Sequence, residues 1–268
     1  MACRKSYRSN TTISEDIKPQ HTITAPVAPK TVSRLLFGVD SKAQSTDVLQ
    51  NNIDLFEWVV RNKIPPNFYA RYISGENALS EGEIDFIHRK GCKIAAIYAD
   101  DTAKKTDDEG AILAKKIALR ALELGIPAGT AIFLELGDNE PLTRDFMRGF
   151  AKILIEEGLT PAFKANTDAK FAFDREFSRG MQTDREIFNK CLIWAVSPTL
   201  SDYNALTTSH VIHPDNWAPY APSAITRREI AIWQYGADCH PIEDNAGKLT
   251  TFNLDLVRNE EVILDKMF

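Results

Sequence analysis

Short apolar runs alternate with longer segments of helical periodicity along most of this chain of 268 residues. Eight of the runs are continuous enough to predict buried β-strands. They cover residues 35–39, 68–73, 93–98, 131–136, 160–165, 191–196, 230–234 and 251–254. Because these runs are apolar on both faces, they predict a parallel sheet that is covered by helices.

The segments between the runs carry apolar residues at spacings of three and four, which predicts amphipathic helices. The helical segments are residues 48–61, 80–90, 107–124, 141–157, a stretch within 167–190, and 255–268. The second segment starts with Ser80, and Glu83 follows three residues later at the spacing of a capping box. A short polar segment, residues 240–250, separates the last two strand runs, so the alternation is irregular there.

Eight strands alternating with helices over about 235 residues predict a (β/α)8 barrel, also called a TIM barrel, whose usual length is about 250 residues. A doubly wound open sheet is the alternative, and it is less favoured because no glycine-rich phosphate loop follows any strand run. Residues 1–33 are polar, contain three prolines and show no hydrophobic period. We therefore expect a flexible N-terminal tail before a single α/β domain over residues 34–268.

The composition of the chain argues against several functional classes. It has 32 Lys and Arg against 37 Asp and Glu, a formal charge of −5, which argues against a dedicated nucleic-acid-binding protein. No apolar run approaches the roughly 20 residues that span a bilayer, and the N-terminus shows no signal peptide. The four cysteines and five histidines are dispersed, so we expect no disulfide framework, no metal site and no cofactor.

Polar and aromatic residues gather where the strand runs end, which in a (β/α)8 barrel is where active sites lie. The candidate catalytic residues are the carboxylates Asp40, Asp100 and Glu135. The candidate ligand-binding residues are Arg71, Tyr98, Asp138, Asn166, Trp194, Trp233, Gln234, Tyr235, Asn253 and Asp255. Tyr72 and Lys164 also lie near strand ends. Together these residues predict an acidic and aromatic mouth with few cations.

Glu135 interrupts an otherwise apolar run, AIFLELG. A carboxylate in that position must pair with a cation, meet water or take up a proton. We expect burial at the barrel mouth to raise its pKa into the range that a general acid needs. The alternatives are that an internal cation satisfies Glu135, that Asp40 orders a loop, and that Asp100 is simply solvated.

Paired carboxylates together with aromatic rings suit the cleavage of a glycosidic bond. One carboxyl group protonates the leaving oxygen, and another stabilises or attacks the sugar carbon. Trp and Tyr rings cover the apolar faces of sugars, and amides read the hydroxyl groups. The segment EIAIWQYG at residues 229–236 places a Trp, a Gln and a Tyr together at one strand end. The sequence therefore predicts a carbohydrate ligand.

Several segments, taken in order, resemble a known family. They are FGVDS at residues 37–41, FYARYISG at 68–75, LSEGEIDFIHRKGCKIAAIY at 79–98, ALELGIPAGTAIFLEL at 121–136 and IWQYG at 232–236. Their order and spacing resemble the glycoside-hydrolase-like barrel described as domain of unknown function 1906, a relative of the family 25 lysozymes, which cleave peptidoglycan. The resemblance implies a bacterial extracellular or cell-wall-associated protein with a glycan ligand.

The resemblance also implies site residues. The Asp after the first strand matches Asp40, and the Trp-Gln-Tyr motif matches residues 233–235. In the lysozyme relatives an Asp-x-Glu pair at the fourth strand cleaves the bond, and here its two places hold Glu135 and Gly137. Two functions follow from this: a glycosidase with Glu135 as proton donor and Asp40 or Asp100 as partner, or an inactive barrel that binds glycan. The oligomeric state is not indicated.

Overall fold

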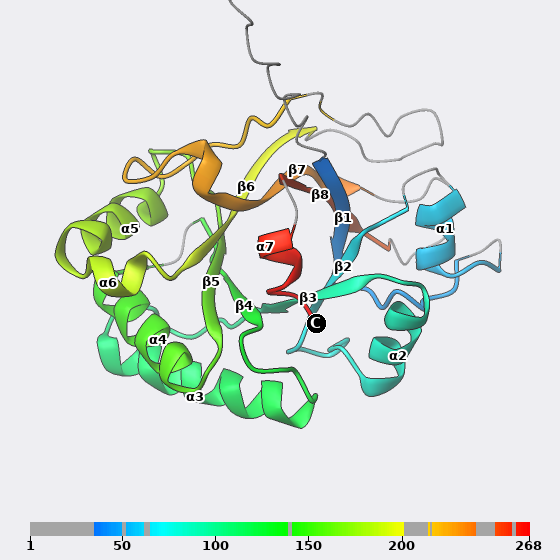
Figure 1. The fold of residues 1–268 in the computed structure, drawn as a ribbon, viewed down its shortest axis with the longest axis horizontal. Helices are drawn as coiled ribbons and strands as arrows, with labels where there is room; N and C mark the ends of the chain where they lie inside the picture. Colours follow the sequence, from blue (N-terminus) through cyan, green and yellow to red (C-terminus); the bar gives the residue numbers. More distant parts are fainter. Residues whose placement is uncertain are drawn as a thin grey trace, which may run out of the picture. The chain divides into compact units, whose positions relative to one another are not determined.

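Eight strands close into one barrel in the computed structural model, which describes residues 35–49, 52–61, 65–138, 141–200, 214, 216–239, 250–258 and 261–268. The strands follow one another around the barrel in chain order, and β8 closes the ring against β1 (Figure 1). The predicted (β/α)8 barrel is confirmed. The expected N-terminal tail, residues 1–33, lies outside the described residues.

Each predicted strand run overlaps one observed strand. The strands are β1 (Leu35–Ser41), β2 (Phe68–Tyr72), β3 (Lys93–Tyr98), β4 (Ala131–Glu135), β5 (Thr160–Ala165), β6 (Leu192–Leu200), β7 (Ile230–Cys239) and β8 (Phe252–Arg258). The helices are α1 (Leu55–Arg61), α2 (Glu81–Arg89), α3 (Asp107–Glu123), α4 (Arg144–Glu156), α5 (Ala172–Thr183), α6 (Arg185–Phe188) and α7 (Glu261–Leu264), with a 3₁₀ turn at Arg227–Glu229.

β8 runs antiparallel to both of its neighbours, so the expected all-parallel sheet is wrong at this one strand. The pairs from β1–β2 through β6–β7 are parallel, whereas β7–β8 and β8–β1 are antiparallel. The sequence between β7 and β8 has no helical period. A parallel return needs a crossover connection, usually a helix, and without one the chain returns antiparallel. The first residues of β8 therefore lie at the barrel end where the other strands finish.

Three helix predictions differ from the structure. The segment 255–268 begins as strand, because residues up to Arg258 pair with β1, and only the short α7 follows. The segment 48–61 becomes helical only at Leu55. The capping box at α2 is half formed: Ser80 Oγ accepts the Glu83 N–H at 3.3 Å, but the Glu83 carboxylate turns to Arg71 instead.

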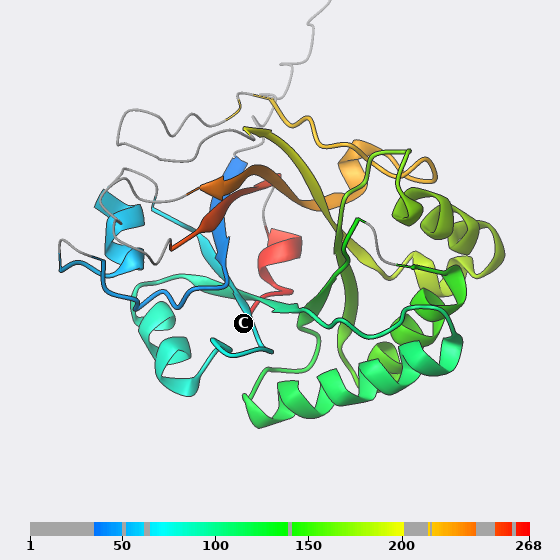
Figure 2. The same cartoon turned by 180° about the vertical axis from the view of Figure 1, so that it is seen from behind.

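Two apolar layers separate the strand side chains. The barrel interior holds Phe68, Ile97, Phe133, Trp194, Ile232 and Val257, and it is closed at one end by Ile263 of α7 and by Met267. In Figures 1 and 2, α7 accordingly lies over the centre of the ring of strands, on the near side in Figure 1 and on the far side in Figure 2. The outer layer, between strands and helices, holds Val39, Tyr69, Ile94, Ile132, Phe146, Phe150 and Trp233. Successive residues of a strand point to opposite faces, so each strand supplies both layers.

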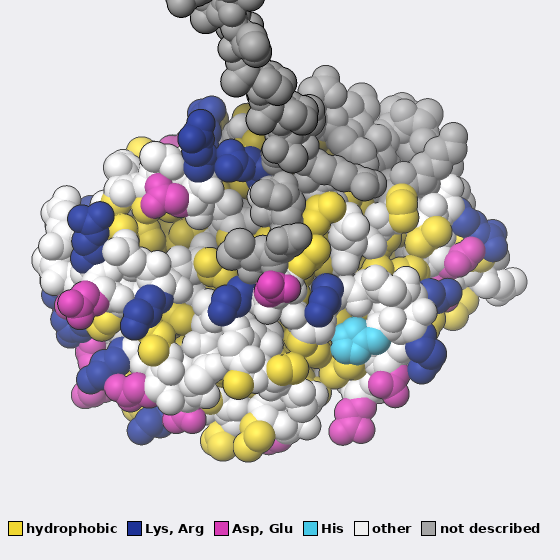
Figure 3. Space-filling model, viewed as in Figure 1, with side chains coloured by type: hydrophobic (Ala, Val, Ile, Leu, Met, Phe, Trp, Pro, Cys, Tyr) yellow, Lys and Arg dark blue, Asp and Glu magenta, His cyan; other side chains and the backbone are white. Residues whose placement is uncertain are grey.

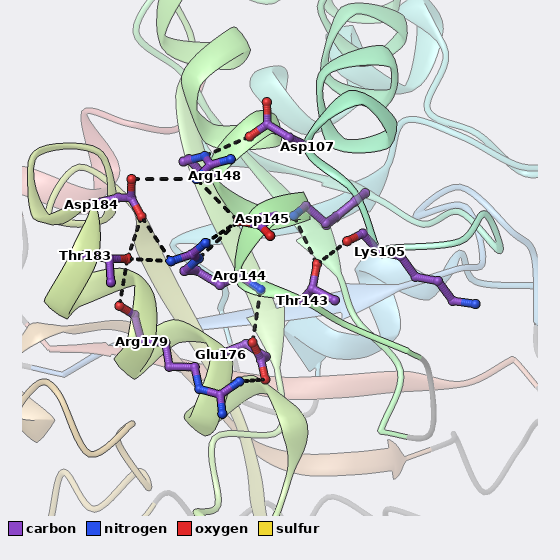
Figure 4. Close-up of polar contacts among 11 residues, drawn as sticks. Lys105, Asp107, Thr143, Arg144, Asp145, Arg148, Glu176, Arg179, Thr183 and Asp184 are labelled. Carbon is purple, nitrogen blue, oxygen red and sulfur yellow. Dashed lines mark hydrogen bonds and ion pairs between the residues drawn. The ribbon is translucent and has the colours of Figure 1, made fainter.

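Helices α3 and α4 lie backbone against backbone. A Cβ atom on Gly110 would meet the Phe146 carbonyl oxygen, and one on Gly149 would meet the Asp107 carbonyl oxygen. Figure 4 shows the ion pairs that join the N-terminal ends of this helix pair to each other and to Asp184, which lies between α5 and α6. Arg148 Nε lies 2.8 Å from Asp107 Oδ1, and its Nη1 lies 3.9 Å from Asp184 Oδ1. Partly exposed pairs of this kind contribute about 0.2–1 kcal/mol each.

Charged side chains of both signs are interspersed over the face that Figure 3 shows. Within the described ranges, no helix combines the length and the apolar character that crossing a bilayer requires.

Candidate functional site

A cavity of about 640 Å³ opens where β1 to β7 end and β8 begins. Seven predicted site residues line it: Asp40, Asp100, Glu135, Asp138, Asn166, Gln234 and Asn253. Lys42, Tyr72, Asp101, Lys164 and Asp238 also line it. The barrel therefore brings most of the predicted polar residues to one place, which we call the mouth cavity.

Strand register explains which side chains meet there. Glu135 on β4 lies directly opposite Lys164 on β5, and Asp40 on β1 lies opposite Asn253 on β8. Paired residues on adjacent strands point to the same face of a sheet, with neighbouring Cβ atoms about 4.5–5.5 Å apart. The register thus places a lysine and a carboxylate together on the inner face.

Lys164 is the centre of the site. Its Nζ lies 2.8 Å from Asp40 Oδ1 and 3.2 Å from Glu135 Oε1, and the lysine side chain is buried. The ammonium also lies 4.9 Å from the centre of the Trp194 ring. Burial alone lowers the pKa of Lys164, but the carboxylates of Asp40 and Glu135 reverse this, so its pKa lies well above the usual value. Lys164 is therefore a permanent cation between two carboxylates.

The expected raised pKa of Glu135 is wrong. The Glu135 side chain is 28% exposed, and its Oε1 accepts the Tyr72 O–H at 2.8 Å as well as the Lys164 ammonium. Burial alone raises the pKa of Glu135, but the charge of Lys164 and the Tyr72 hydrogen bond outweigh it, so the pKa lies below its usual value. Glu135 is consequently ionised at neutral pH, because a cation faces it across the strand pair.

Asp40, which lines the cavity, and Asp255, which lies beneath it, form a pair of carboxyl groups, and both are fully buried. Asp40 Oδ1 accepts hydrogen bonds from Lys164 Nζ and from Asn253 Nδ2 at 2.9 Å, while Asp255 Oδ1 accepts the Trp194 indole N–H at 3.1 Å. Burial and the charge of Asp40 raise the pKa of Asp255 well above its usual value. Asp40 Oδ2 and Asp255 Oδ2 accept no hydrogen bond from another described residue, and a proton on Asp255 that bonds Asp40 satisfies both atoms.

Asp100 belongs to the cavity wall but is held by its own loop. Its Oδ1 accepts the Thr102 N–H at 2.6 Å, and its Oδ2 lies 3.3 Å from Lys116 Nζ. Burial raises the pKa of Asp100, but the Thr102 hydrogen bonds and the Lys116 ammonium together lower it by more, so the pKa lies below its usual value. At the rim, Asp138 Oδ2 accepts the Asn166 amide at 3.2 Å. These groups order the rim and act as acceptors.

Four predicted binding residues point away from the cavity: Arg71, Tyr98, Trp233 and Tyr235. Tyr98, Trp233 and Tyr235 belong to the outer apolar layer, and the indole N–H of Trp233 donates to the Ser197 carbonyl at 3.0 Å. Arg71 is buried and forms an ion pair with Glu83, with its Nε 2.8 Å from Glu83 Oε1. The expectation that Tyr98 and Trp233 share the pocket of Glu135 is wrong, because alternation places them on the opposite face of their strands. Trp233, at 1% exposure, offers no open ring to a sugar.

Two predicted residues point inward but lie beneath the cavity. Trp194 is fully buried among the barrel side chains, with the Lys164 ammonium above its ring. Asp255, the second of these residues, accepts the hydrogen bond from the Trp194 indole N–H. Lys164 and Tyr72 lie near predicted strand ends, but the sequence pattern indicates no role for either. The available signal was a lysine inside the apolar fifth run, TPAFKA, at the same strand depth as Glu135. In the described part of the chain, no group of three or more His, Cys, Asp and Glu side chains could hold a metal ion.

Comparison with known proteins identifies the fold. No family model matches the chain, and no curated protein matches it. The structure is similar to that of an uncharacterized B. stearothermophilus protein, with a TM-score of 0.69 and 22% identity over 87% of this chain and 100% of that one.

Two lysozyme structures share the architecture. The bacterial lysozyme from Streptomyces coelicolor has a TM-score of 0.50 at 11% identity, covering 86% of this chain and 96% of its own. A family GH25 lysozyme from Aspergillus fumigatus has a TM-score of 0.50 at 12% identity, covering 87% and 98%. The chain therefore has a lysozyme-like barrel fold.

Proposed function

We propose that this chain is a glycoside-hydrolase-like barrel that binds a cell-wall-type polysaccharide in the mouth cavity and does not cleave it by the lysozyme route. Three observations support binding: the barrel is the one that lysozymes use, the cavity lies at its mouth, and polar side chains line it. The cavity volume of about 640 Å³ is within the range of small-molecule sites.

The contact between Lys164 and both Asp40 and Glu135 carries the second half of the proposal. Glycoside hydrolysis needs one carboxyl group that is protonated and within reach of the leaving oxygen. Glu135 is ionised, and Gly137 occupies the place of the second carboxylate. The pKa of Asp255 is raised, but this residue is fully buried and does not line the cavity. Glu135 therefore faces a ligand as a hydrogen-bond acceptor and not as an acid.

One observation favours a second candidate, a glycosidase. Glu135 is an ionised carboxylate on the cavity wall, which is the state required of a group that stabilises or attacks the sugar carbon. In that case a rim carboxyl, Asp100 or Asp138, would have to donate the proton. Glu135 would then be the partner of the acid, and not the acid itself as the sequence predicts.

The test combines a binding and a turnover measurement. Calorimetry with soluble fragments of peptidoglycan, chitin and β-glucan should show saturable binding of at least one, and incubation with the same polymers should release no reducing ends. Asn166→Ala removes an amide from the cavity wall and should weaken binding, whereas Asn189→Ala removes an exposed amide elsewhere and should not.

Two outcomes would overturn this proposal. Release of reducing ends that is lost in Glu135→Gln would establish the glycosidase, because the isosteric amide keeps the hydrogen bond from Tyr72 and removes the carboxylate. Absence of saturable binding to every fragment would exclude a saccharide ligand for the cavity.

A further inference from the structure

The mouth cavity has a strong excess of negative charge. Six carboxylates line it, namely Asp40, Asp100, Asp101, Glu135, Asp138 and Asp238, against two ammonium groups, Lys42 and Lys164. A concave site lined by one sign of charge concentrates the field and raises the local concentration of opposite charge. The cavity therefore attracts cations and repels anions.

The unbalanced charges are those at the rim. Asp40 and Glu135 share Lys164, and Asp100 pairs with Lys116. The exposed carboxylates of Asp101, Asp138 and Asp238 have no ion-pair partner among the residues that the structure describes. Rim carboxylates without a cation can pair with a positively charged group on a ligand.

Gln234 is an independent sign of a ligand that donates hydrogen bonds. Its side chain lines the cavity and is 4% exposed, yet its Oε1 accepts no hydrogen bond from any described residue. Leaving a buried acceptor unpaired costs about 1–3 kcal/mol, so such an atom calls for a donor. Two donors that line the same cavity, the Lys164 ammonium and the Tyr72 hydroxyl, bind Asp40 and Glu135. A complementary ligand thus brings donors and positive charge.

We propose that the mouth cavity selects saccharides that carry protonated amines, namely glucosamine units without their N-acetyl groups, over N-acetylated or carboxylate-bearing saccharides. This inference rests on the proposed function, since it names the class of glycan that the same cavity binds. An ammonium group supplies three hydrogen-bond donors and one positive charge on the hydroxyl-rich frame of a sugar. An N-acetyl group supplies neither the charge nor the extra donors.

The experiment compares a glucosamine tetramer with the N-acetylglucosamine tetramer by calorimetry. At about pH 6, carboxylates are ionised and amines are protonated. We expect the glucosamine tetramer to bind about tenfold more tightly at low salt, and the difference to shrink towards 0.15 M salt, where the Debye length is about 8 Å. A carboxylate-bearing fragment should bind more weakly than either tetramer.

Rim variants locate the effect. Asp138→Asn combined with Asp238→Asn should lower the affinity for the glucosamine tetramer about three- to tenfold, and lower that for the N-acetylated tetramer by clearly less. Asp265→Asn is the control, because it removes an exposed carboxyl beside α7, which closes the other end of the barrel. Equal affinity for the two tetramers would overturn this inference and leave the proposed function intact. No binding of any saccharide would overturn both.

Discussion

A single side chain, Lys164, sets the chemistry of the mouth cavity. Its ammonium lies against both Asp40 and Glu135 and lowers the pKa of Glu135, so Glu135 is not available as a proton donor at neutral pH. Of the carboxyl groups in the cluster, Asp255, which lies beneath the wall, is the one whose pKa is raised. The same acidic residue types that suit hydrolysis therefore produce a site that accepts hydrogen bonds.

The buried proton on Asp255 gives a prediction about pH and stability. The pKa of Asp255 is raised in the folded protein, while an unfolded Asp has a pKa of about 3.9. As the pH rises above that value the unfolded chain loses its proton and the folded protein keeps it, so this group's contribution to stability falls. Asp255→Asn cannot titrate, and its amide can donate to Asp40, so the variant should gain stability relative to the parent as the pH rises.

Urea unfolding of both proteins at about pH 5 and about pH 8 checks this, because the difference in unfolding free energy should be larger at the higher pH. Asp265→Asn, which removes an exposed carboxyl, is the control. A difference that does not change with pH would show that Asp255 is ionised in the folded protein.

The sequence predicts the polar residues of the mouth better than their roles. Glu135, Asp40 and Gln234 reach the cavity because they lie in the inward phase of a strand. Trp233 and Tyr235 carry the same motif signal but lie in the outward phase. A one-residue offset decides between cavity and core, and an apolar run that is buried on both faces gives no alternation from which to read the phase.

Among the elements, the positions of the strands can be predicted from the sequence, but the antiparallel direction in which β8 closes the barrel cannot. Each apolar run becomes a strand in its expected place, because a strand covered on both sides is recognisable by its continuous apolar character. The direction of β8 depends on the connection before it, and its pairing with β1 extends the strand to Arg258, where the apolar spacing resembles a helix.

The contact between α3 and α4 gives a prediction at the scale of elements. A methyl group on Gly149 would collide with the Asp107 carbonyl, which is backbone and cannot move aside. Gly149→Ala should therefore destabilise the protein by about 1–3 kcal/mol in urea unfolding, as overpacking does. Gly82→Ala in α2 is the control, since a Cβ there meets no atom within 4 Å. It should stabilise by about 0.5–1 kcal/mol. Equal effects of the two changes would show that the helices do not approach so closely.

Over the whole molecule, the two ends of the barrel divide binding from closure. The mouth cavity lies where β1 to β7 end. At the other end the C-terminal segment covers the barrel: the Ile94 N–H donates to the Phe268 carbonyl at 2.6 Å, and the Ala131 N–H donates to the Lys266 carbonyl at 2.8 Å. Residues at the closed end of such barrels serve stability, and those at the mouth serve function.

Met267 tests this division because it fills the closed end. Its side chain is buried among the interior residues of the barrel, next to Ile263 of α7. Met267→Ala should lower the unfolding free energy by about 2–5 kcal/mol, the usual cost of emptying a buried site. Saccharide affinity at a temperature where the variant is folded should be unchanged, since the mouth cavity does not contain this residue. Leu122→Ala removes an apolar side chain that is 76% exposed and should change stability by less than about 0.5 kcal/mol. A loss of affinity in folded Met267→Ala protein would show that the two ends of the barrel are coupled.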